Sequence, residues 1–186
     1  MEDYVYVLDF LPMGRPDVSR KRQGATSYGI GEDQFTLLEL IPKPGATLTI
    51  GERIYVGKDP QKRSKISKIR GRVAYEELTS TAHGELPYTI IEIVKAKESK
   101  FIKFYSEAPA ISTRFHALEL LPGLGKKTML AIVDEQKKGP FASFDDLEER
   151  VESLHSPEKL IAKRIELEIV EPNQKYHLFT RPMRQE

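Results

Sequence analysis

The chain has 186 residues, and its 29 lysine and arginine residues nearly balance its 28 aspartate and glutamate residues, for a net charge of +1. Hydrophobic residues make up 39% of the chain and charged residues 31%, which is typical of a soluble globular protein. The absence of cysteine excludes disulfides, thiolate metal sites and cysteine nucleophiles, and no apolar run approaches the ~20 residues of a membrane span, so we expect a cytoplasmic protein with no membrane partner.

The first part of the chain is predicted to be rich in short β-strands. Alternating aromatic and β-branched residues predict a strand over residues 4–11, which ends at Pro12 and Gly14. Residues 15–31 hold one proline and three glycines, and we expect a long basic loop there. Further extended segments are predicted at residues 34–41, 47–50, 52–56 and 65–75.

Short strands with glycine and proline corners favour a small β-barrel over residues 1–75, and an OB-like barrel is a frequent platform for nucleic acids. The fifth strand that such a barrel needs is missing locally, and residues 176–180 could supply it by folding back. The aromatic rings available for stacking on bases, or for core packing instead, are Tyr4, Tyr6, Phe10, Tyr28, Phe35 and Tyr55. The pattern leaves both roles open for each ring.

Residues 76–109 are predicted to form a helical spacer after the barrel. Thr79 or Ser80 can cap its start, an apolar stripe runs through it, and Pro109 ends it. Lysines on this segment would provide another binding face, but glutamates lie among them, so packing is the favoured role.

A glycine-bearing turn is the strongest signal in the chain. It reads Leu121-Pro122-Gly123-Leu124-Gly125 and is followed directly by Lys126, Lys127 and Thr128, and we predict that these eight residues form a phosphate-binding segment. Glycine adopts backbone conformations that other residues avoid, and it lets a ligand approach the chain closely. The unpaired N–H groups and positive dipole end of the next helix, together with the two lysine ammonium groups, would form an anion site.

Two helices are predicted to flank this turn. Before it, Phe115, Leu118 and Leu121 recur at helical spacing, and Ser112 or Thr113 can cap the helix. The helix after the turn carries its own apolar residues and is predicted to end at Gly139-Pro140.

These residues resemble the helix-hairpin-helix family, whose glycine-bearing hairpin binds the sugar-phosphate backbone of DNA, and sometimes RNA, without reading bases. The residues that match its pattern are the apolar Leu121 and Leu124, the glycines Gly123 and Gly125, and the phosphate-facing Lys126 and Lys127. Such hairpins usually occur in pairs. We therefore assign residues 110–172 to a helix-hairpin-helix domain and residues 173–186 to an extended tail that returns to the barrel.

A second hairpin is present in outline only. Ser143 can cap a helix over residues 144–151, and Ser156-Pro157 opens another. The connecting residues lack glycine, and five acids lie within residues 145–152. We therefore expect this copy to pack against the first hairpin rather than to bind phosphate.

Basic residues gather in three segments, which together predict positive faces for a phosphate backbone, although each alone could be a solvated face. The segment with the highest charge contains Lys58, Lys62, Arg63, Lys65, Lys68, Arg70 and Arg72. The other two contain Arg15, Arg20, Lys21 and Arg22 in the N-terminal loop, and Lys175, His177, Arg181 and Arg184 near the C-terminus.

The chain as a whole is similar to an uncharacterised archaeal family of predicted RNA-binding proteins, a resemblance that implies no known activity. We expect an α+β, non-enzymatic nucleic-acid-binding protein that prefers RNA over DNA and needs no cofactor or metal. A single asparagine and many charged residues lean towards a thermophile. Two alternatives stay open: a module that docks an acidic ribosomal or transcription-associated protein, and a nucleic-acid-processing enzyme that uses the acids of residues 145–152.

Overall fold

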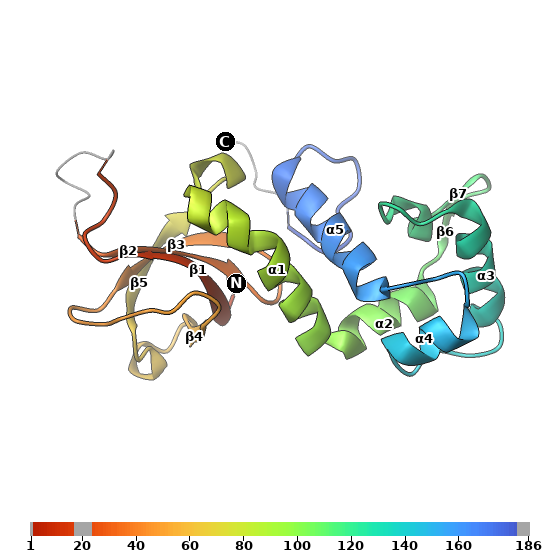
Figure 1. Ribbon diagram of the computed structural model, residues 1–186, viewed down its shortest axis with the longest axis horizontal. Helices are drawn as coiled ribbons and strands as arrows, with labels where there is room; N and C mark the ends of the chain where they lie inside the picture. Colours follow the sequence, from red (N-terminus) through yellow and green to blue (C-terminus); the bar gives the residue numbers. More distant parts are fainter. Residues whose placement is uncertain (1, 17–23, 182–186) are drawn as a thin grey trace. The chain divides into compact units, whose positions relative to one another are not determined.

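The computed structural model describes residues 2–16 and 24–181 and has the predicted α+β character (Figure 1). The chain divides into two compact units. One contains Met1–Thr89 and Glu168–Glu186, and the other contains Ile90–Leu167. The boundaries therefore fall inside the two helices α1 (Ser80–Ala96) and α5 (Pro157–Val170), and not at the ends of the predicted spacer.

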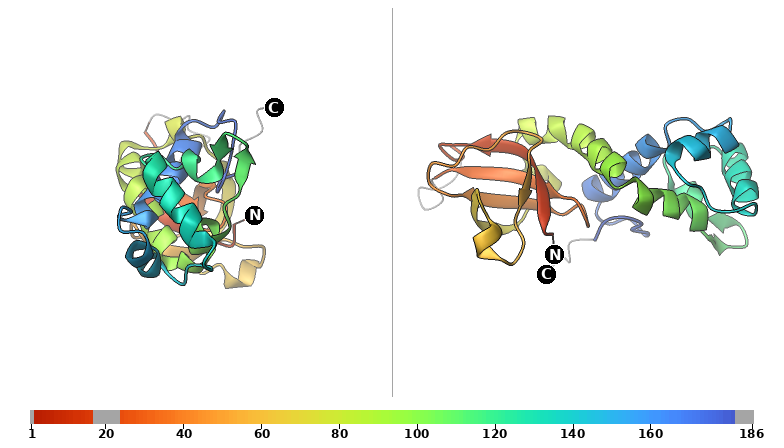
Figure 2. Two further views of the ribbon diagram at one scale, coloured as in Figure 1. Left: turned by 90° about the vertical axis from the view of Figure 1, so that its right-hand side faces the viewer. Right: turned by 90° about the horizontal axis from the view of Figure 1, so that it is seen from below.

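The first unit is built on a curled antiparallel sheet of five strands, which forms a half-barrel (Figure 2). Its strands are β1 (Tyr4–Leu11), β2 (Thr26–Gly31), β3 (Leu37–Pro42), β4 (Arg53–Tyr55) and β5 (Ile66–Arg72). They are hydrogen-bonded in the order β4-β1-β2-β3-β5, so β4 and β5 are the two edges. Short 3-10 helices, η2 (Pro60–Lys62) and η3 (Tyr75–Glu77), lie on either side of β5 along the chain.

The sequence prediction of a loop over residues 15–31 is wrong for its last six residues, because these form the strand β2. Its glycines do not make turns; they give room for close packing. A Cβ atom at Gly29 would lie 3.1 Å from the carbonyl oxygen of Tyr6, and one at Gly31 would overlap the side chain of Glu2. β2 is thus the strand that was missing from the sequence prediction, and it comes from the same part of the chain as the other four. Residues 176–180 form no strand, and neither do residues 47–50.

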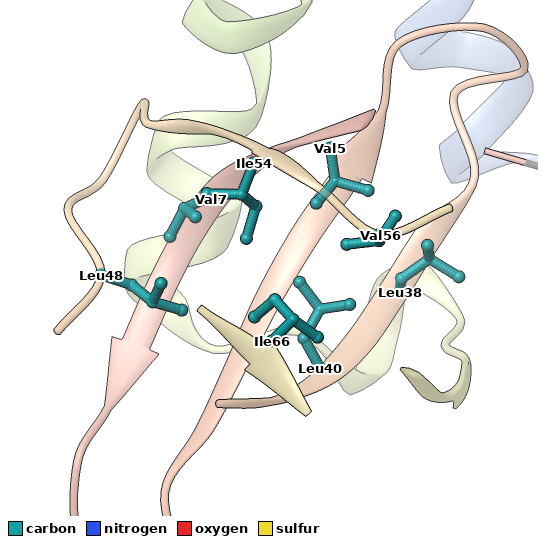
Figure 3. Packing of buried hydrophobic residues seen from close by; sticks show 8 residues of the cluster. All are labelled: Val5, Val7, Leu38, Leu40, Leu48, Ile54, Val56 and Ile66. Atoms are coloured by element: carbon teal, nitrogen blue, oxygen red, sulfur yellow. The ribbon is translucent and has the colours of Figure 1, made fainter. Parts of the chain in front are cut away.

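Eight buried aliphatic residues fill the inside of the curl (Figure 3). They come from the strands and from the segments beside β4: Val5, Val7, Leu38, Leu40, Leu48, Ile54, Val56 and Ile66. Their burial removes apolar surface from water, which is the main driving force for curling the sheet.

The aromatic residues of this unit divide between core and surface. Tyr28 and Phe35 are only 3% and 2% exposed, so they belong to the core. Tyr4, Tyr6, Phe10 and Tyr55 are half-buried. The Arg53 guanidinium lies 3.6 Å from the centre of the Tyr4 ring and pairs with Glu32 at 2.6 Å.

The predicted helical segment consists of α1 and α2 (Glu98–Glu107), separated at Lys97. Thr79 caps α1 as expected, since its hydroxyl oxygen accepts a hydrogen bond from the amide of Ala82 at 3.1 Å. The same hydroxyl donates to Asp9 at 2.6 Å and so ties the start of the helix to β1. Pro87 lies inside α1 without ending it. No helix of the described residues has the length and apolar character that crossing a membrane requires.

The second unit contains a small two-stranded sheet, β6 (Ala110–Ser112) and β7 (Phe115–His116), followed by the 3-10 helix η4 (Ala117–Leu120). Three α-helices lie beyond them: α3 (Lys126–Gln136), α4 (Phe144–Arg150) and α5. The α-helix predicted before the glycine turn is therefore wrong. Pro122 disfavours a helical conformation at Leu121, which leaves too few residues after β7 for more than a short 3-10 turn.

Tyr105 is the centre of this second unit. It is fully buried, its hydroxyl donates to the carbonyl of Pro157 at 2.8 Å, and its own carbonyl accepts from Gln136 at 2.6 Å. Its ring meets Phe144 edge-on, with 6.4 Å between the centroids. One α2 residue thus connects α3, α4 and α5.

The C-terminal tail is held by a buried carboxylate. Glu168 on α5 accepts hydrogen bonds from the backbone amides of Leu178, Phe179 and Thr180 at 2.7, 3.1 and 2.9 Å. Three amide donors satisfy a charge that would otherwise be costly to bury. Residues Glu168–Glu186 belong to the same compact unit as the sheet, and the described part of the tail pairs with none of its strands.

We expect Tyr105→Phe to lower the free energy of unfolding by about 1–2 kcal/mol, because the carbonyl of Pro157 loses its donor in a dry interior. Burial raises the pKa of Tyr105, so the hydroxyl stays protonated and able to donate. Chemical denaturation measures the change. The control is Tyr88→Phe, since Tyr88 is 70% exposed and should tolerate the loss of its hydroxyl. Equal stability of the two variants would show that the Tyr105 bond contributes nothing.

Candidate nucleic-acid interface

The glycine turn reverses the chain between η4 and α3. It is closed by a hydrogen bond of 3.2 Å from the amide of Leu124 to the carbonyl of Leu121. Gly123 has a φ of 90°, in the region that favours glycine, whereas Gly125 has a φ of −73° and a ψ of 153°, which any residue can adopt. Gly123 is therefore required by the turn, and Gly125 is not.

Gly125 is surrounded by open space. A Cβ atom built on it would meet no other atom within 4 Å. Gly125 is the N-cap of α3, where glycine is accepted but asparagine, aspartate and serine fit at least as well, so neither the helix start nor the packing requires the absence of a side chain. A ligand that approaches the backbone closely at this point would explain it.

The helix α3 presents its first amides at the same place. Its first intrahelical bond runs from the amide of Met129 to the carbonyl of Gly125 at 2.9 Å, so the amides of residues 126–128 precede the hydrogen-bonded ladder. Lys126 and Lys127 are exposed, and neither has an ion-pair partner among the residues that the structure describes. The start of α3 therefore combines its first backbone amides, the positive end of the helix dipole and two ammonium groups without ion-pair partners. All of them lie beside the uncovered backbone of Gly125.

Buried residues of the same unit hold the hairpin in place. Leu121 is 1% exposed, and buried Arg164 on α5 donates to the carbonyl of Leu120 at 3.3 Å. Thr128, predicted to help bind phosphate, donates its hydroxyl to Ser153 in the second hairpin at 3.0 Å. This contact brings the two turns together and leaves Lys126 and Lys127 as the charged groups at the first one.

The second hairpin contains one backbone hydrogen bond that corresponds to the bond closing the first. The amide of Leu154 bonds to the carbonyl of Val151 at 2.9 Å, and α5 starts shortly afterwards. Ser143 caps α4 by accepting from the amide of Asp146 at 3.0 Å, as the sequence predicted. The equivalents of the first hairpin's glycines and lysines are missing here.

Several acids of residues 145–152 have structural partners. Asp146 accepts from the amide of Ala142 at 2.9 Å, and Glu148 accepts from the amide of Ser156. Among the described residues, no group of three or more histidine, aspartate or glutamate side chains is arranged to hold a metal ion. Two of the five acids thus bind backbone amides: Asp146 binds one just before α4, and Glu148 binds one just before α5.

The basic segment of residues 58–72 lies in the other unit, around β5. Lys65 pairs with Glu52 at 2.5 Å, and this hydrogen bond lowers the pKa of Glu52. Arg70 pairs with Glu39 at 2.5 Å, and Lys62 lies 3.9 Å from Asp59. Arg63 donates to the carbonyl of Gly57 at 2.8 Å. Besides Arg63, the residues of this segment without an ion-pair partner in the described part of the chain are Lys58, Lys68 and Arg72, and these three are exposed.

The other two basic segments are described only in part. Arg15 donates to the hydroxyl of Tyr28 at 3.2 Å and to the carbonyl of Glu77 at 2.7 Å, so it connects β2 with the end of η3. The residues that fall outside the described ranges are Arg20, Lys21, Arg22 and Arg184. Their predicted contribution to a positive face stays a prediction.

A comparison with protein-family models shows which family the chain belongs to. The model of a family described as a protein of unknown function, DUF655, matches residues 1–181. The chain belongs to the DUF655 family.

Two archaeal proteins are closely similar to this chain. The uncharacterized protein MJ0038 of Methanocaldococcus jannaschii is 46% identical over 181 residues, which are 97% of this chain and 80% of that protein. The crystal structure of Af1531 from Archaeoglobus fulgidus is 47% identical, with a TM-score of 0.89 over 97% of this chain and all of that one. The expected membership of an archaeal family is thus confirmed.

Sequence reasoning missed two arginines that support the hairpin of this DUF655 chain, and it predicted a partly buried structural role for His116 but not its role as a cap. Arg150 donates to the carbonyls of Glu135 and Gly139 at 2.7 and 3.0 Å and so closes the end of α3, while Arg164 supports the hairpin. His116 is the N-cap of η4, where its Nδ1 accepts from the amide of Leu118 at 3.1 Å. Their only sequence signal was a charged or polar residue beside an apolar pattern, which does not distinguish a cap from a solvated side chain.

We expect Gly123→Ala to lower the free energy of unfolding by about 1–2 kcal/mol, because alanine is strained at a positive φ. The matched change is Gly125→Asn, which sits at an ordinary φ in open space and creates a good helix cap. Thermal unfolding should show a loss for the first variant and none for the second. The opposite ranking would contradict the described turn.

The stability of η4 should depend on pH through His116. Burial lowers the pKa of His116, and only the neutral ring can accept from Leu118, so the folded state resists protonation. The stabilisation that the neutral His116 ring adds to the folded state is complete above the ordinary histidine pKa of about 6.5. It is lost as the pH falls through the lowered pKa that His116 has in the folded protein. His116→Asn keeps a cap without titrating. The stability difference between wild type and variant, measured from pH 7 to pH 5, should therefore shift in favour of the variant.

Proposed function

We propose that this chain is a non-enzymatic nucleic-acid-binding protein, whose hairpin at Gly123–Lys127 binds the sugar-phosphate backbone in the manner of a helix-hairpin-helix module. The observation that carries the proposal is the open position at Gly125, directly before two exposed, unpaired lysines at the start of α3. Backbone contacts of this kind position a protein without specifying sequence.

The sheet unit supports the same proposal with separate cations. Lys58, Lys68 and Arg72 are exposed around β5 without ion-pair partners in the described residues. The half-barrel serves in this proposal as an OB-like platform, although its sheet is open between β4 and β5. We propose RNA as the preferred ligand because the whole chain resembles a family of predicted RNA-binding proteins, and shape would then contribute to selection.

The most direct test is Gly125→Asp. Aspartate is a good helix cap and its charge favours the positive end of the helix dipole, so the folded state should keep or gain stability. The same charge would repel phosphate, and we expect binding to weaken tenfold or more. Gly125→Asn has the same shape without the charge and separates repulsion from crowding.

Fluorescence anisotropy with single-stranded RNA, an RNA hairpin and duplex DNA, each at several salt concentrations, provides the measurement. Lys126→Glu with Lys127→Glu should weaken binding to all sequences alike and lower the log-log salt slope by about 0.7–0.9 for each lost phosphate contact. If folded Gly125→Asp binds like wild type, the hairpin is not the phosphate site. Binding to acidic proteins but to none of the nucleic acids would make the lysines a protein-docking surface.

A further inference from the structure

The half-barrel has a hollow at one end of its sheet. It encloses about 550 Å³ and is lined by the ends of β1 and β3, by the turn that follows β3 and by β5. Phe10, Ile41 and Pro42 supply apolar surface, and Lys43 and Arg70 supply charge. A hollow of this volume lies within the usual range for small-ligand sites.

Phe10 gives this hollow an aromatic surface. Its half-buried ring packs against the aliphatic cluster of the half-barrel and also lines the hollow. The core thus fixes one side of the ring, while part of it stays accessible. A fixed, partly accessible ring suits the stacking of a flat, uncharged group.

The charged groups around the hollow are mostly cationic. Lys43 is exposed, and Arg70 is exposed although it pairs with Glu39. Lys68 lies directly opposite Ile41 in the register of β3 and β5 and has no ion-pair partner in the described residues. Lys43 and Lys68, which have no ion-pair partner in the described residues, favour an anionic ligand, and the apolar lining favours one that also carries a flat apolar part.

A nucleotide with an unpaired base combines both properties. We propose that this hollow is a second nucleic-acid site, in which the base of a single-stranded segment stacks on Phe10 while its phosphates lie beside Lys43 and Lys68. The proposal rests on the proposed function for the class of ligand. It adds that the sheet unit selects unpaired over paired strands, because a base within a duplex cannot expose its face to Phe10.

The absence of tryptophan from the chain makes a specific test possible. Phe10→Trp places a single indole in the hollow, and stacking of a base on it should quench its fluorescence. The probes are tetrauridylate, tetraadenylate and a short duplex DNA. We expect saturable quenching by the tetranucleotides and none by the duplex. Tyr88→Trp is the control, because Tyr88 is exposed on α1 and does not line the hollow.

Affinity provides a second readout that does not depend on the fluorophore. Phe10→Leu keeps an apolar side chain against the core but removes the stacking ring, and we expect it to weaken tetranucleotide binding roughly tenfold. Lys43→Glu should weaken binding similarly. Lys103→Glu reverses an exposed charge in the other unit and should leave binding to the hollow unchanged.

The outcomes separate this proposal from the hairpin proposal when Gly125→Asp is combined with each variant. Quenching of Phe10→Trp that persists with Gly125→Asp supports an independent site in the hollow, whatever happens at the hairpin. Binding that depends on Gly125 but leaves Phe10→Trp unquenched overturns the hollow and keeps the hairpin. Quenching by duplex as strong as by single strands, or no binding of any probe, also overturns it.

Discussion

The candidate site depends on the chain reversing at Gly123 with a φ of 90°. Only this reversal ends the buried segment at Leu121 and starts α3 three residues beyond Gly123, with its first amides and both lysines turned to solvent. A residue with a Cβ atom would strain the turn and disturb the position of every group after it. The proposed phosphate site thus depends first on the backbone and second on its side chains.

The hairpin is useful as a site only because the unit behind it is firmly packed. Tyr105 connects α2 to the three helices that follow, and Arg150 and Arg164 donate to carbonyls at the end of α3 and before the turn. These buried or half-buried polar groups satisfy backbone atoms that the helix ends leave unpaired. A rigid frame of this kind holds the amides of α3 in place before a ligand arrives, which lowers the entropy lost on binding.

The charges of this protein divide into two classes that the net charge of +1 does not reveal. Lys65, Arg70 and Arg150 are engaged with neighbouring carboxylates, whereas Lys68, Lys126 and Lys127 have no such partner among the described residues. Only charges of the second class offer their full attraction to a phosphate backbone, because the first class is already largely neutralised. Each compact unit has members of this second class, which is consistent with a protein that contacts nucleic acid with both.

Local patterns in the sequence were enough to predict β1, the strand at β5, the caps at Thr79 and Ser143, and the glycine turn with its lysines, because each depends on residues within about one turn or one strand. Tertiary structure alone decided that β2 is a strand, since Gly29 and Gly31 are explained by the close approach of Tyr6 and Glu2 from β1 and the residues before it. It also decided that Thr128 binds Ser153, that Asp146 and Glu148 accept from backbone amides, and that Phe10 lines a hollow. These features join residues far apart in the chain, and whether a charged, glycine or aromatic residue is buried, paired or free depends on which distant residues the fold brings beside it.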